Sequence, residues 1–447
     1  MAIFDTARKQ LQKLFGKGHE ENTGADPIDR AGMPADPAMA KNDGVVGFAH
    51  TVIGHSHEKK GTACQDASVY IQKAGYTLIV VSDGHGSGNF PRSDRGSRFA
   101  CQAAASAVDI FVRDFDPAML EEEGRHAAAV VQLCKNILLQ WNAAVEADWK
   151  AEPITEEEAA EADEKYRAAY LNGERCTHAY GTTLLAVLMT PKYILAIRNG
   201  DGQCVTIDRT GSFDTPIPWN DKCRANMVTS LCDYNAIQEF RAWFSKDLPA
   251  AVFIGTDGID NSYPRQADLF GLYCNICTEA LRNGLETAGR DAAEFLPKLT
   301  QQGSRDDVSM AGILSGSALR AVQTELEAYL AERQRLKALE ASKRQLARLN
   351  RELKELHKRL GLTEQHLQDS MQELEQVENG SSSWSTIPGL EPTEAELEAL
   401  MDGIRTAECE ITDLKARQSD LSEAVAAEKE KRAQLEAAAP GAQPPAQ

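Results

Sequence analysis

The stretch Thr77-Leu-Ile-Val-Val-Ser-Asp-Gly-His-Gly-Ser-Gly88 contains the strongest fold signal in this sequence. Its aliphatic and β-branched residues, Leu78 to Val81, predict a buried strand that ends just before Asp83. Glycines on both sides of His85 remove side-chain bulk and permit unusual backbone angles. The backbone carbonyl of Gly84 can therefore approach a cation directly. An Asp-Gly pair after a strand is also an ordinary turn, so a metal interpretation depends on residues elsewhere.

The composition indicates a folded, acidic protein. The chain has 447 residues, of which 42% are hydrophobic, and its 67 acidic and 48 basic residues give a formal charge of −19. A chain of this length can bury a sizeable core and has room for more than one domain. Its negative charge repels polyphosphate backbones and attracts divalent cations, so we expect no nucleic-acid partner.

The termini and the cysteines bear on location. No apolar stretch reaches the length that spans a bilayer, and the N-terminus lacks a signal-peptide core, which together predict a cytoplasmic protein. Residues Met1 to Lys17 predict a basic amphipathic helix that either attaches peripherally to an anionic membrane or, as we favour, docks on a protein. The ten scattered cysteines predict reduced thiols. Zinc or redox chemistry at Cys274 and Cys277 is the weaker alternative, because no second close pair completes a site.

The middle of the chain, residues 45–316, predicts one domain of strands and helices. Short apolar runs predict strands at Val45–Ile53, Ala67–Gln72, Thr77–Val81, Thr182–Met189, Tyr193–Ile197, Cys204–Ile207, Ala250–Ile254 and Val308–Leu314. Helical periodicity predicts helices at about Arg95–Val112, Gly124–Trp149, Glu156–Leu171, Gln266–Leu285 and Asp291–Gln301. Strands that come in runs favour an α+β arrangement over a doubly wound parallel sheet.

Different textures flank this domain. Residues 1–44 combine the N-terminal helix with a flexible linker from His19 to Gly44. Leucines at three-four spacing predict a coiled-coil helix over residues 317–378 and a second one over 393–438. The Ser- and Pro-containing residues 379–392 predict a break, and residues 439–447 a disordered tail. Both an antiparallel helical hairpin and an intermolecular coiled coil satisfy this pattern.

Further aspartates stand at strand boundaries in the middle domain. They are Asp66, Asp201, Asp257, Asp306 and Asp307. Each alone has an ordinary explanation as a turn or cap residue. Together with Asp83 they predict carboxylates that converge on one rim of a sheet, where hard cations such as Mg²⁺ or Mn²⁺ would neutralise their repulsion. A two-metal site is the arrangement that such a cluster favours.

The order of these motifs resembles the metal-dependent protein serine/threonine phosphatases of type 2C, especially bacterial ones. The similar segments are Gln65-Asp66-Ala67, Val81-Ser-Asp-Gly-His-Gly86, Tyr180-Gly-Thr-Thr183, Asn199-Gly-Asp-Gly202, Gly255-Thr-Asp-Gly-Ile259 and Gly303-Ser-Arg-Asp-Asp-Val-Ser-Met310. No single motif is specific, but the full set in this order is. The resemblance covers about Val45 to Leu314 and implies a four-layer α-β-β-α sandwich of two antiparallel sheets.

The resemblance also implies a metal-ligand set with two ions and room for a third. Asp83 would bridge the two metals, the Gly84 carbonyl and Asp66 would be further ligands, Asp257 and Asp306 would complete the pair, and Asp201 with Asp257 would hold a third ion. Asp307, where many members have Asn, would contact the ligands rather than a metal. A water between two cations becomes hydroxide near neutral pH, and His85 could protonate the leaving oxygen.

The sequence departs from the family pattern at two positions. Gln65 stands where many members have Glu, so its uncharged amide would change the surroundings of the ligands. Gly61 stands near the position of a phosphate-gripping Arg, and His57, Lys59 or Lys60 could take that role unless they belong to a solvent-exposed loop.

Three functions remain open from the sequence. We expect an active phosphatase in cytoplasmic signalling that acts on phosphoserine or phosphothreonine in proteins and is opposed by a serine/threonine protein kinase. The alternative is a weakly active or inactive phosphatase-like scaffold that binds phosphoproteins and assembles through its coiled coil. A third interpretation is an oligomerising structural protein that carries the domain as a passenger. The coiled coil could bind a partner, self-associate or pack only on itself.

Overall fold

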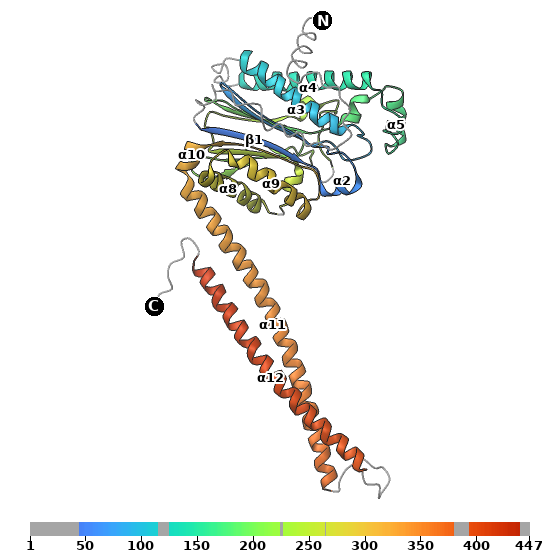
Figure 1. Cartoon of the computed structure of the whole chain (residues 1–447), viewed down its shortest axis with the longest axis vertical. Coiled ribbons are helices and arrows are strands. Elements are labelled where there is room, and N and C mark those ends of the chain that lie inside the picture. The colour runs from blue at the N-terminus through green and yellow to red at the C-terminus, as the bar shows by residue number, and fades with distance from the viewer. Residues whose placement is uncertain (1–43, 115–124, 224–226, 264, 380–392, 439–447) are drawn as a thin grey trace. The chain divides into compact units, whose positions relative to one another are not determined.

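The structure is a computed structural model, and it describes residues 44–114, 125–223, 227–263, 265–379 and 393–438 (Figure 1). These residues form two compact units that divide after Tyr329. The predictions for the N-terminal helix and linker, for the break after residue 379 and for the tail concern residues outside the described ranges. No helix within the described ranges is long and apolar enough to cross a membrane.

The first unit contains two five-stranded antiparallel sheets, as predicted. One sheet has the order β1-β10-β9-β6-β7 and the other β2-β3-β4-β5-β8. The strands are β1 (Val45–Val52), β2 (Ala67–Lys73), β3 (Tyr76–Ser82), β4 (Leu184–Met189), β5 (Ile194–Asn199), β6 (Gln203–Ile207), β7 (Phe213–Asp214), β8 (Arg241–Ser245), β9 (Ala251–Gly255) and β10 (Val308–Ser315).

Helices cover the outer face of each sheet and complete the four layers (Figure 1). On the β3 sheet lie α3 (Ser93–Asp114) and α4 (Arg125–Ala151), and along the β10 sheet lie α8 (Gln266–Asn283) and α9 (Thr287–Gln302). Shorter helices are α2 (His55–Lys60), α5 (Glu164–Leu171), η3 (Cys176–Tyr180), α6 (Ala236–Glu239), α7 (Asp257–Asp260) and α10 (Gly316–Ala321). The predicted α+β sandwich is therefore confirmed.

Strand β3 shows why the central strands are continuously apolar. Side chains alternate between the two faces of a strand. Leu78 and Val80 belong to the core between the sheet and its helices, whereas Ile79 and Val81 belong to the core between the two sheets. All four are at most 1% exposed. Because both faces are buried, the strand carries no polar alternation, and it delivers Asp83 to the end of the sandwich.

The structure corrects the sequence prediction in three places. The helix expected at Glu156–Leu171 begins only at Glu164, because the Glu158 carboxylate accepts hydrogen bonds from the Thr155 backbone N–H and from Arg92, which stabilises turns before it. The expected loop at residues 55–60 is the helix α2, which ends at Gly61 with φ 69°. Strand β8 was not predicted, because it is an edge strand whose side chains are only partly buried.

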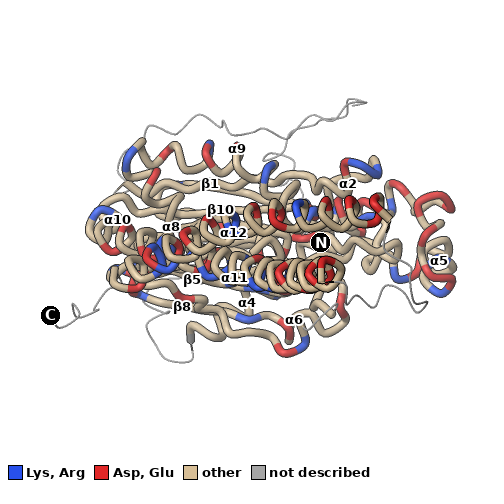
Figure 2. The backbone as a smooth tube through the Cα atoms, turned by 90° about the horizontal axis from the view of Figure 1, so that it is seen from below, with Lys and Arg blue, Asp and Glu red and all other residues tan. Residues whose placement is uncertain are grey.

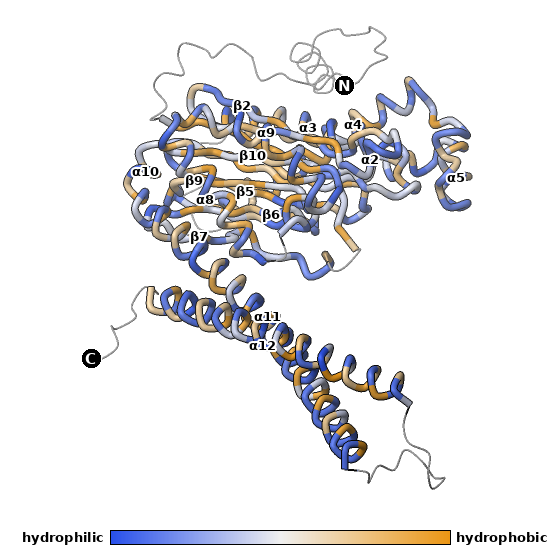
Figure 3. Tube along the Cα trace, turned by 60° about the horizontal axis from the view of Figure 1, so that its bottom comes forward, coloured by the Kyte–Doolittle hydropathy of each residue, from blue (hydrophilic) through white to orange (hydrophobic). Residues whose placement is uncertain are grey.

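The second unit contains most of α11 (Gln323–Glu378) and all of α12 (Glu394–Ala437). The two helices run antiparallel, since Arg335 Nη1 donates to the Leu435 carbonyl at 2.6 Å and Arg359 pairs with Glu410 at 2.7 Å. Their apolar contact includes Leu356, Leu360, Ile411 and Leu414, and hydrophobic residues recur along both helices (Figure 3). Two long helices that pack as a hairpin are thus present, while a supercoil or an outside partner stays a prediction.

All ten cysteines are free. Cys274 and Cys277 are fully buried within α8, as their helical pattern predicts. Burial raises the pKa of both thiols, which disfavours the thiolate that zinc or redox chemistry requires. The structure therefore gives no support to the weaker zinc or redox interpretation.

Candidate active site

Acidic side chains from both sheets meet at one end of the sandwich. Asp83 follows β3, Asp66 precedes β2, and Asp257 begins α7 directly after β9. Burial, together with the charges of Asp66 and Asp257, raises the pKa of Asp83 well above its ordinary value. Burial and the charges of Asp307 and Asp257 do the same for the pKa of Asp66. The three predicted aspartates thus lie within electrostatic reach of one another.

Asp201 and Asp306 face the same centre. Burial and the charge of Asp257 raise the pKa of Asp201, in the turn between β5 and β6, to about 6. Burial and the charge of Asp257 also raise the pKa of Asp306, although the backbone N–H of Asp307 donates to it at 2.9 Å and partly offsets the shift. Asp257 is therefore the neighbour that the other predicted ligands share.

Gly84 occupies a position that only glycine fits. Its backbone N–H donates to the Gln65 carbonyl at 3.1 Å. A Cβ atom there would lie 2.5 Å from the Gln65 carbonyl oxygen and 2.7 Å from the Ser93 carbonyl oxygen, and both are backbone atoms that cannot rotate away. The glycine lets the loop after β3 lie directly against the segment that carries Asp66.

The carboxylates are gathered but not arranged as a ready-made cation cage. Among the described residues, no group of three or more His, Cys, Asp and Glu side chains is arranged to hold a metal ion. Asp257 instead lies close enough to Asp83 to raise the pKa of the Asp83 carboxyl, and Asp66 accepts a hydrogen bond from the Thr256 hydroxyl at 2.8 Å. Clustered carboxylates whose pKa values are raised by loss of water and by mutual repulsion are nevertheless the donor set that suits Mg²⁺ or Mn²⁺.

Asp260 belongs to this cluster, although the sequence interpretation gave it no role. It ends α7, three residues after Asp257, and its Oδ1 atom is buried without a hydrogen-bond partner. Burial and the charges of Asp257 and Asp201 raise the pKa of Asp260 to about 8. The available signal was the three-residue spacing, which places two carboxylates on one face of a helical turn.

Asp307 connects the starts of several elements through one carboxylate. Its Oδ1 accepts from the Gly54 backbone N–H at 2.6 Å and lies 2.9 Å from His57 Nδ1, and its Oδ2 accepts from the Gln65 backbone N–H at 2.6 Å. Asp307 thereby fixes the segment that leads into Asp66. This geometry suits the expected role of Asp307, which is to contact the metal ligands rather than a metal.

Lys59 and Lys60, the predicted phosphate-binding residues, are exposed on α2.

His85 is the predicted proton donor. Its backbone N–H donates to the Gly181 carbonyl at 3.1 Å, and its ring meets Phe90 edge-on with the centroids 4.7 Å apart. Burial and the proximity of His178 lower the pKa of His85 to about 4. The imidazole is therefore neutral at pH 7 before substrate binds.

Sequence comparison identifies the family. A profile described as protein phosphatase 2C matches residues 53–296, which is more than half of the chain. This chain belongs to the protein phosphatase 2C family. It is therefore a protein serine/threonine phosphatase, and its family membership implies dependence on a divalent metal. The matched range includes Asp66, Asp83, Asp201 and Asp257 and ends before Asp306.

Among solved structures, similarity extends to several phosphatases. The Mycobacterium tuberculosis serine/threonine phosphatase PstP/Ppp is 15% identical, with 60% of this chain and 97% of that chain covered and a TM-score of 0.37. PppA of Pseudomonas aeruginosa is 16% identical, with the same coverage and TM-score. A C. elegans sex-determining protein is 12% identical, with 62% and 67% coverage and a TM-score of 0.39. No curated protein sequence matches the chain.

Proposed function

We propose that this phosphatase hydrolyses phosphoserine and phosphothreonine in proteins with two Mg²⁺ or Mn²⁺ ions held at the aspartate cluster. The ligands would be Asp66, Asp83, the Gly84 carbonyl, Asp257 and Asp306, and Asp201 with Asp257 would hold a third ion. The observation that supports this assignment is that Asp66, Asp83, Asp201 and Asp306 all have Asp257 as an electrostatic neighbour. Carboxylates that gather around one neighbour repel one another unless a cation accompanies them, and Asp66 is also buried.

Two bound cations would lower the pKa of a water shared between them and would neutralise charge on the phosphate. The chain's own residues supply the geometry for this chemistry. Asp307 fixes the approach to Asp66 through the Gln65 backbone, and the close contact at Gly84 fixes the approach to Asp83. The contact at Gly84 is between backbone atoms, and the Asp307 carboxylate that holds the Gln65 backbone is 4% exposed, so both ligand-bearing segments are held in place before substrate binds.

His85 would deliver a proton to the leaving serine or threonine oxygen. Because burial lowers the pKa of His85, its imidazole would first have to take up a proton, and the water that attacks the phosphorus would release one. A phosphate dianion next to the ring favours this uptake, since an opposite charge stabilises the imidazolium. Replacement of His85 would accordingly affect the step that expels the alcohol.

The substrate phosphate would be held by basic residues of α2. Lys59 and Lys60 are exposed there, and neither forms an ion pair with any residue that the structure describes. His57 is engaged by Asp307 at 2.9 Å, so it would reach the phosphate only as part of that pair. The substrates would be phosphoproteins of the cytoplasm, with a serine/threonine kinase acting in opposition.

The scaffold alternative rests on Gln65, where a charged residue is expected, and on Gly61, near the expected position of a phosphate-gripping Arg. The Gln65 backbone is nevertheless held by Asp307, and its carbonyl accepts from Gly84, so the substitution leaves the ligand-bearing backbone in place. We therefore favour catalysis over a purely binding role.

The test is hydrolysis of a phosphothreonine peptide by the full chain with Mn²⁺, with Mg²⁺ or with a chelator. The test variant is Asp83→Asn with Asp257→Asn, and the matched control is Asp247→Asn, an aspartate exposed on the loop after β8. We expect metal-dependent turnover that the double variant loses by on the order of a thousandfold, the equivalent of about 4 kcal/mol. Wild-type protein that folds and binds Mn²⁺ but shows no turnover would favour the scaffold.

A further inference from the structure

A segment between α4 and η3, residues 152–175, lies against the loop that follows β3. This segment is acidic where it surrounds the start of α5 (Figure 2). The loop, residues 83–90, contains three glycines at positions 84, 86 and 88, so its own sequence restrains it weakly. At Gly88 a Cβ atom would lie 2.5 Å from the backbone oxygen of Glu161, which shows how closely the two segments pack.

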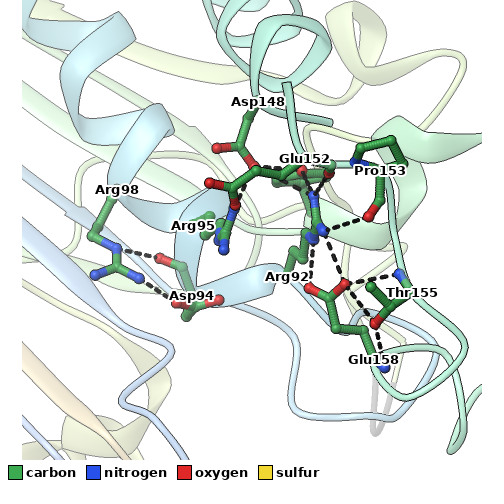
Figure 4. Close-up of polar contacts among 10 residues, drawn as sticks. Arg92, Asp94, Arg95, Arg98, Asp148, Glu152, Pro153, Thr155 and Glu158 are labelled. Atoms are coloured by element: carbon green, nitrogen blue, oxygen red, sulfur yellow. Dashed lines mark hydrogen bonds and ion pairs between the residues drawn. The ribbon is translucent and has the colours of Figure 1, made fainter. Parts of the chain in front are cut away.

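Arg92 anchors the first half of the segment (Figure 4). It stands directly before α3 and is 3% exposed. Its Nε and Nη2 atoms donate to the two oxygens of Glu158 at 2.8 and 2.9 Å, and its Nη1 donates to the Glu152 carbonyl at 2.7 Å. A bidentate pair of this kind, with its arginine buried and its glutamate 31% exposed, fixes orientation as well as distance. The turns around Glu158 are thereby held against the N-terminal end of α3.

A reciprocal pair joins the segment to the loop itself. Asn89 Nδ2 donates to Asp163 Oδ2 at 3.0 Å, and the Asp163 backbone N–H donates to Asn89 Oδ1 at 2.8 Å. The Tyr170 hydroxyl donates to the Asn89 carbonyl at 2.6 Å. Asn89 is thus held at its Nδ2, Oδ1 and carbonyl oxygen atoms by Tyr170 of α5 and by Asp163, the residue that precedes this helix.

Aromatic rings continue this contact to His85. The ring of Phe90 meets His85 at 4.7 Å and stacks on His178 at 4.6 Å, and His178 stacks on Tyr166 at 4.2 Å. Tyr170 lies 2.7 Å from His178 Nδ1 through its hydroxyl. Tyr166 and Tyr170 are four residues apart and therefore share one face of α5, and Asp163 directly precedes the helix.

We propose that residues 152–175 are a positioning element for the catalytic loop. Asp163 and Tyr170 hold Asn89, Tyr166 supports Phe90 through the ring of His178, and these contacts set the placement of His85 and Asp83. This inference rests on the proposed function of those two residues. None of the positioning residues touches substrate in this scheme. Their effect is to remove loop conformations in which His85 and Asp83 are displaced, since a misplacement of about 1 Å can cost a hundredfold in rate.

The experiment exchanges the partners of the reciprocal pair in the full chain. Asn89→Asp removes the amide donor and sets two carboxylates against each other, whereas Asn89→Asp with Asp163→Asn restores a donor and an acceptor in the opposite order. We expect Asn89→Asp to lower kcat on a phosphothreonine peptide by roughly tenfold to a hundredfold with KM within about twofold. The exchanged double variant should recover to within about threefold of wild type. Glu157→Gln, an exposed change in the same segment, is the matched control and should leave kcat unchanged.

A second measurement separates this inference from the proposed function. Calorimetric titration with Mn²⁺ alone should show weaker binding in Asn89→Asp and recovery in the exchanged variant, because Asp83 lies on the same loop. If wild type binds Mn²⁺ but has no turnover, the proposed function fails while this titration still decides the positioning role. A kcat and Mn²⁺ affinity that are unchanged in Asn89→Asp would overturn the inference. So would losses that the exchange does not restore.

Discussion

The two units of this phosphatase use charged residues in opposite ways. In the sandwich, Asp66 is buried and Asp83 is partly buried beside other carboxylates, and the loss of water together with the neighbouring charges raises the pKa of each. In the helical hairpin, Arg359 and Glu410 are 61% and 43% exposed and pair across the helices at 2.7 Å. Exposed pairs contribute little to stability, whereas buried like charges oppose it. A carboxylate cluster that lowers the stability of the folded protein indicates a functional site. The charged residues of the hairpin instead keep the outer faces of its two helices soluble in water.

Glycines show the same difference. At Gly96, in α3, an added Cβ would collide with the backbone oxygen of Tyr180, and the Gly96 carbonyl accepts from Trp141 Nε1 at 3.0 Å. At Gly361, in α11, an added Cβ would meet nothing within 4 Å. One substitution, glycine to alanine, should therefore have opposite signs in the two units.

The largest effect is expected from Gly96→Ala. The added methyl cannot be accommodated without moving α3 away from η3, and we expect the free energy of unfolding to fall by about 3 kcal/mol or more. Chemical denaturation followed by tryptophan fluorescence measures this, because Trp141 is fully buried in the sandwich core. A variant as stable as wild type would show that the helix contact is more yielding than the structure indicates.

Leu414→Ala tests how much the packing between α11 and α12 contributes to the stability of the hairpin. Leu414 is 2% exposed in the contact between α11 and α12, and we expect its truncation to destabilise the hairpin by about 2 to 3 kcal/mol. Helix signal by circular dichroism at 222 nm should then be lost at a lower temperature. Peptide hydrolysis should stay within about twofold of wild type. A matching loss of turnover would mean that the sandwich depends on the hairpin.

The acidic cluster predicts an unusual pH dependence for the metal-free chain. The pKa values of Asp201 and Asp260 are raised to about 6 and about 8, above an ordinary value near 4, so the unfolded chain holds fewer protons than the folded one between these limits. The contribution of Asp201 and Asp260 to the free energy of unfolding should therefore be fully present below about pH 4. This contribution should decrease as the pH rises to 8. Taken in full, these two shifts would amount to about 5 kcal/mol between pH 5 and 8. Both side chains are partly exposed and water screens their charges, so with chelator present we expect a loss on the order of 2 kcal/mol.

Thermal unfolding of the sandwich across this pH range is the measurement. Asp260→Asn should flatten the dependence, and Mn²⁺ should raise the melting temperature most at pH 8, where the carboxylates are ionised. The transition of the exposed hairpin should not shift over the same range. Equal melting temperatures at pH 5 and 8 with chelator would contradict the charge repulsion inferred here.

The smallest effect is expected from Gly361→Ala. A glycine within a helix costs roughly 0.5 to 1 kcal/mol relative to alanine, and no neighbour opposes the methyl group here. The hairpin should unfold at a slightly higher temperature by circular dichroism. A destabilised variant would point to a contact of α11 beyond those in the described residues.

Much of the fold followed from the sequence because its signals are local. The apolar run Leu78–Val81 and the leucine spacing in α11 each specify an element without distant help. The edge strand β8 could not be predicted from the sequence, since its side chains are only partly buried and it therefore lacks a clear apolar pattern. The turns before α5 did not follow either, because the partner that stabilises them, Arg92, lies more than sixty residues away.

The site was predictable as a set of residues but not as an arrangement. Aspartates at strand ends indicated a cluster, and the structure brings Asp66, Asp83, Asp201 and Asp306 around Asp257. Asp260 was missed because its importance comes from burial, which a turn sequence does not reveal. The contact of Asn89 with Asp163 joins residues 74 positions apart and leaves no periodic signal in either segment.

The pairing of β1 with β10 sets an order in time. Val45 lies opposite Ser315 and Val52 opposite Val308. During synthesis, the first strand of the sandwich therefore has no partner on this side until the last strand has been made. At a synthesis rate of roughly 5 to 20 residues per second, that wait is on the order of 10 to 50 s. During it, Asp66 has been made but Asp306 has not. A nascent chain therefore carries Asp66, Asp83, Asp201 and Asp257 before β10, and Asp306 just ahead of it, have been made.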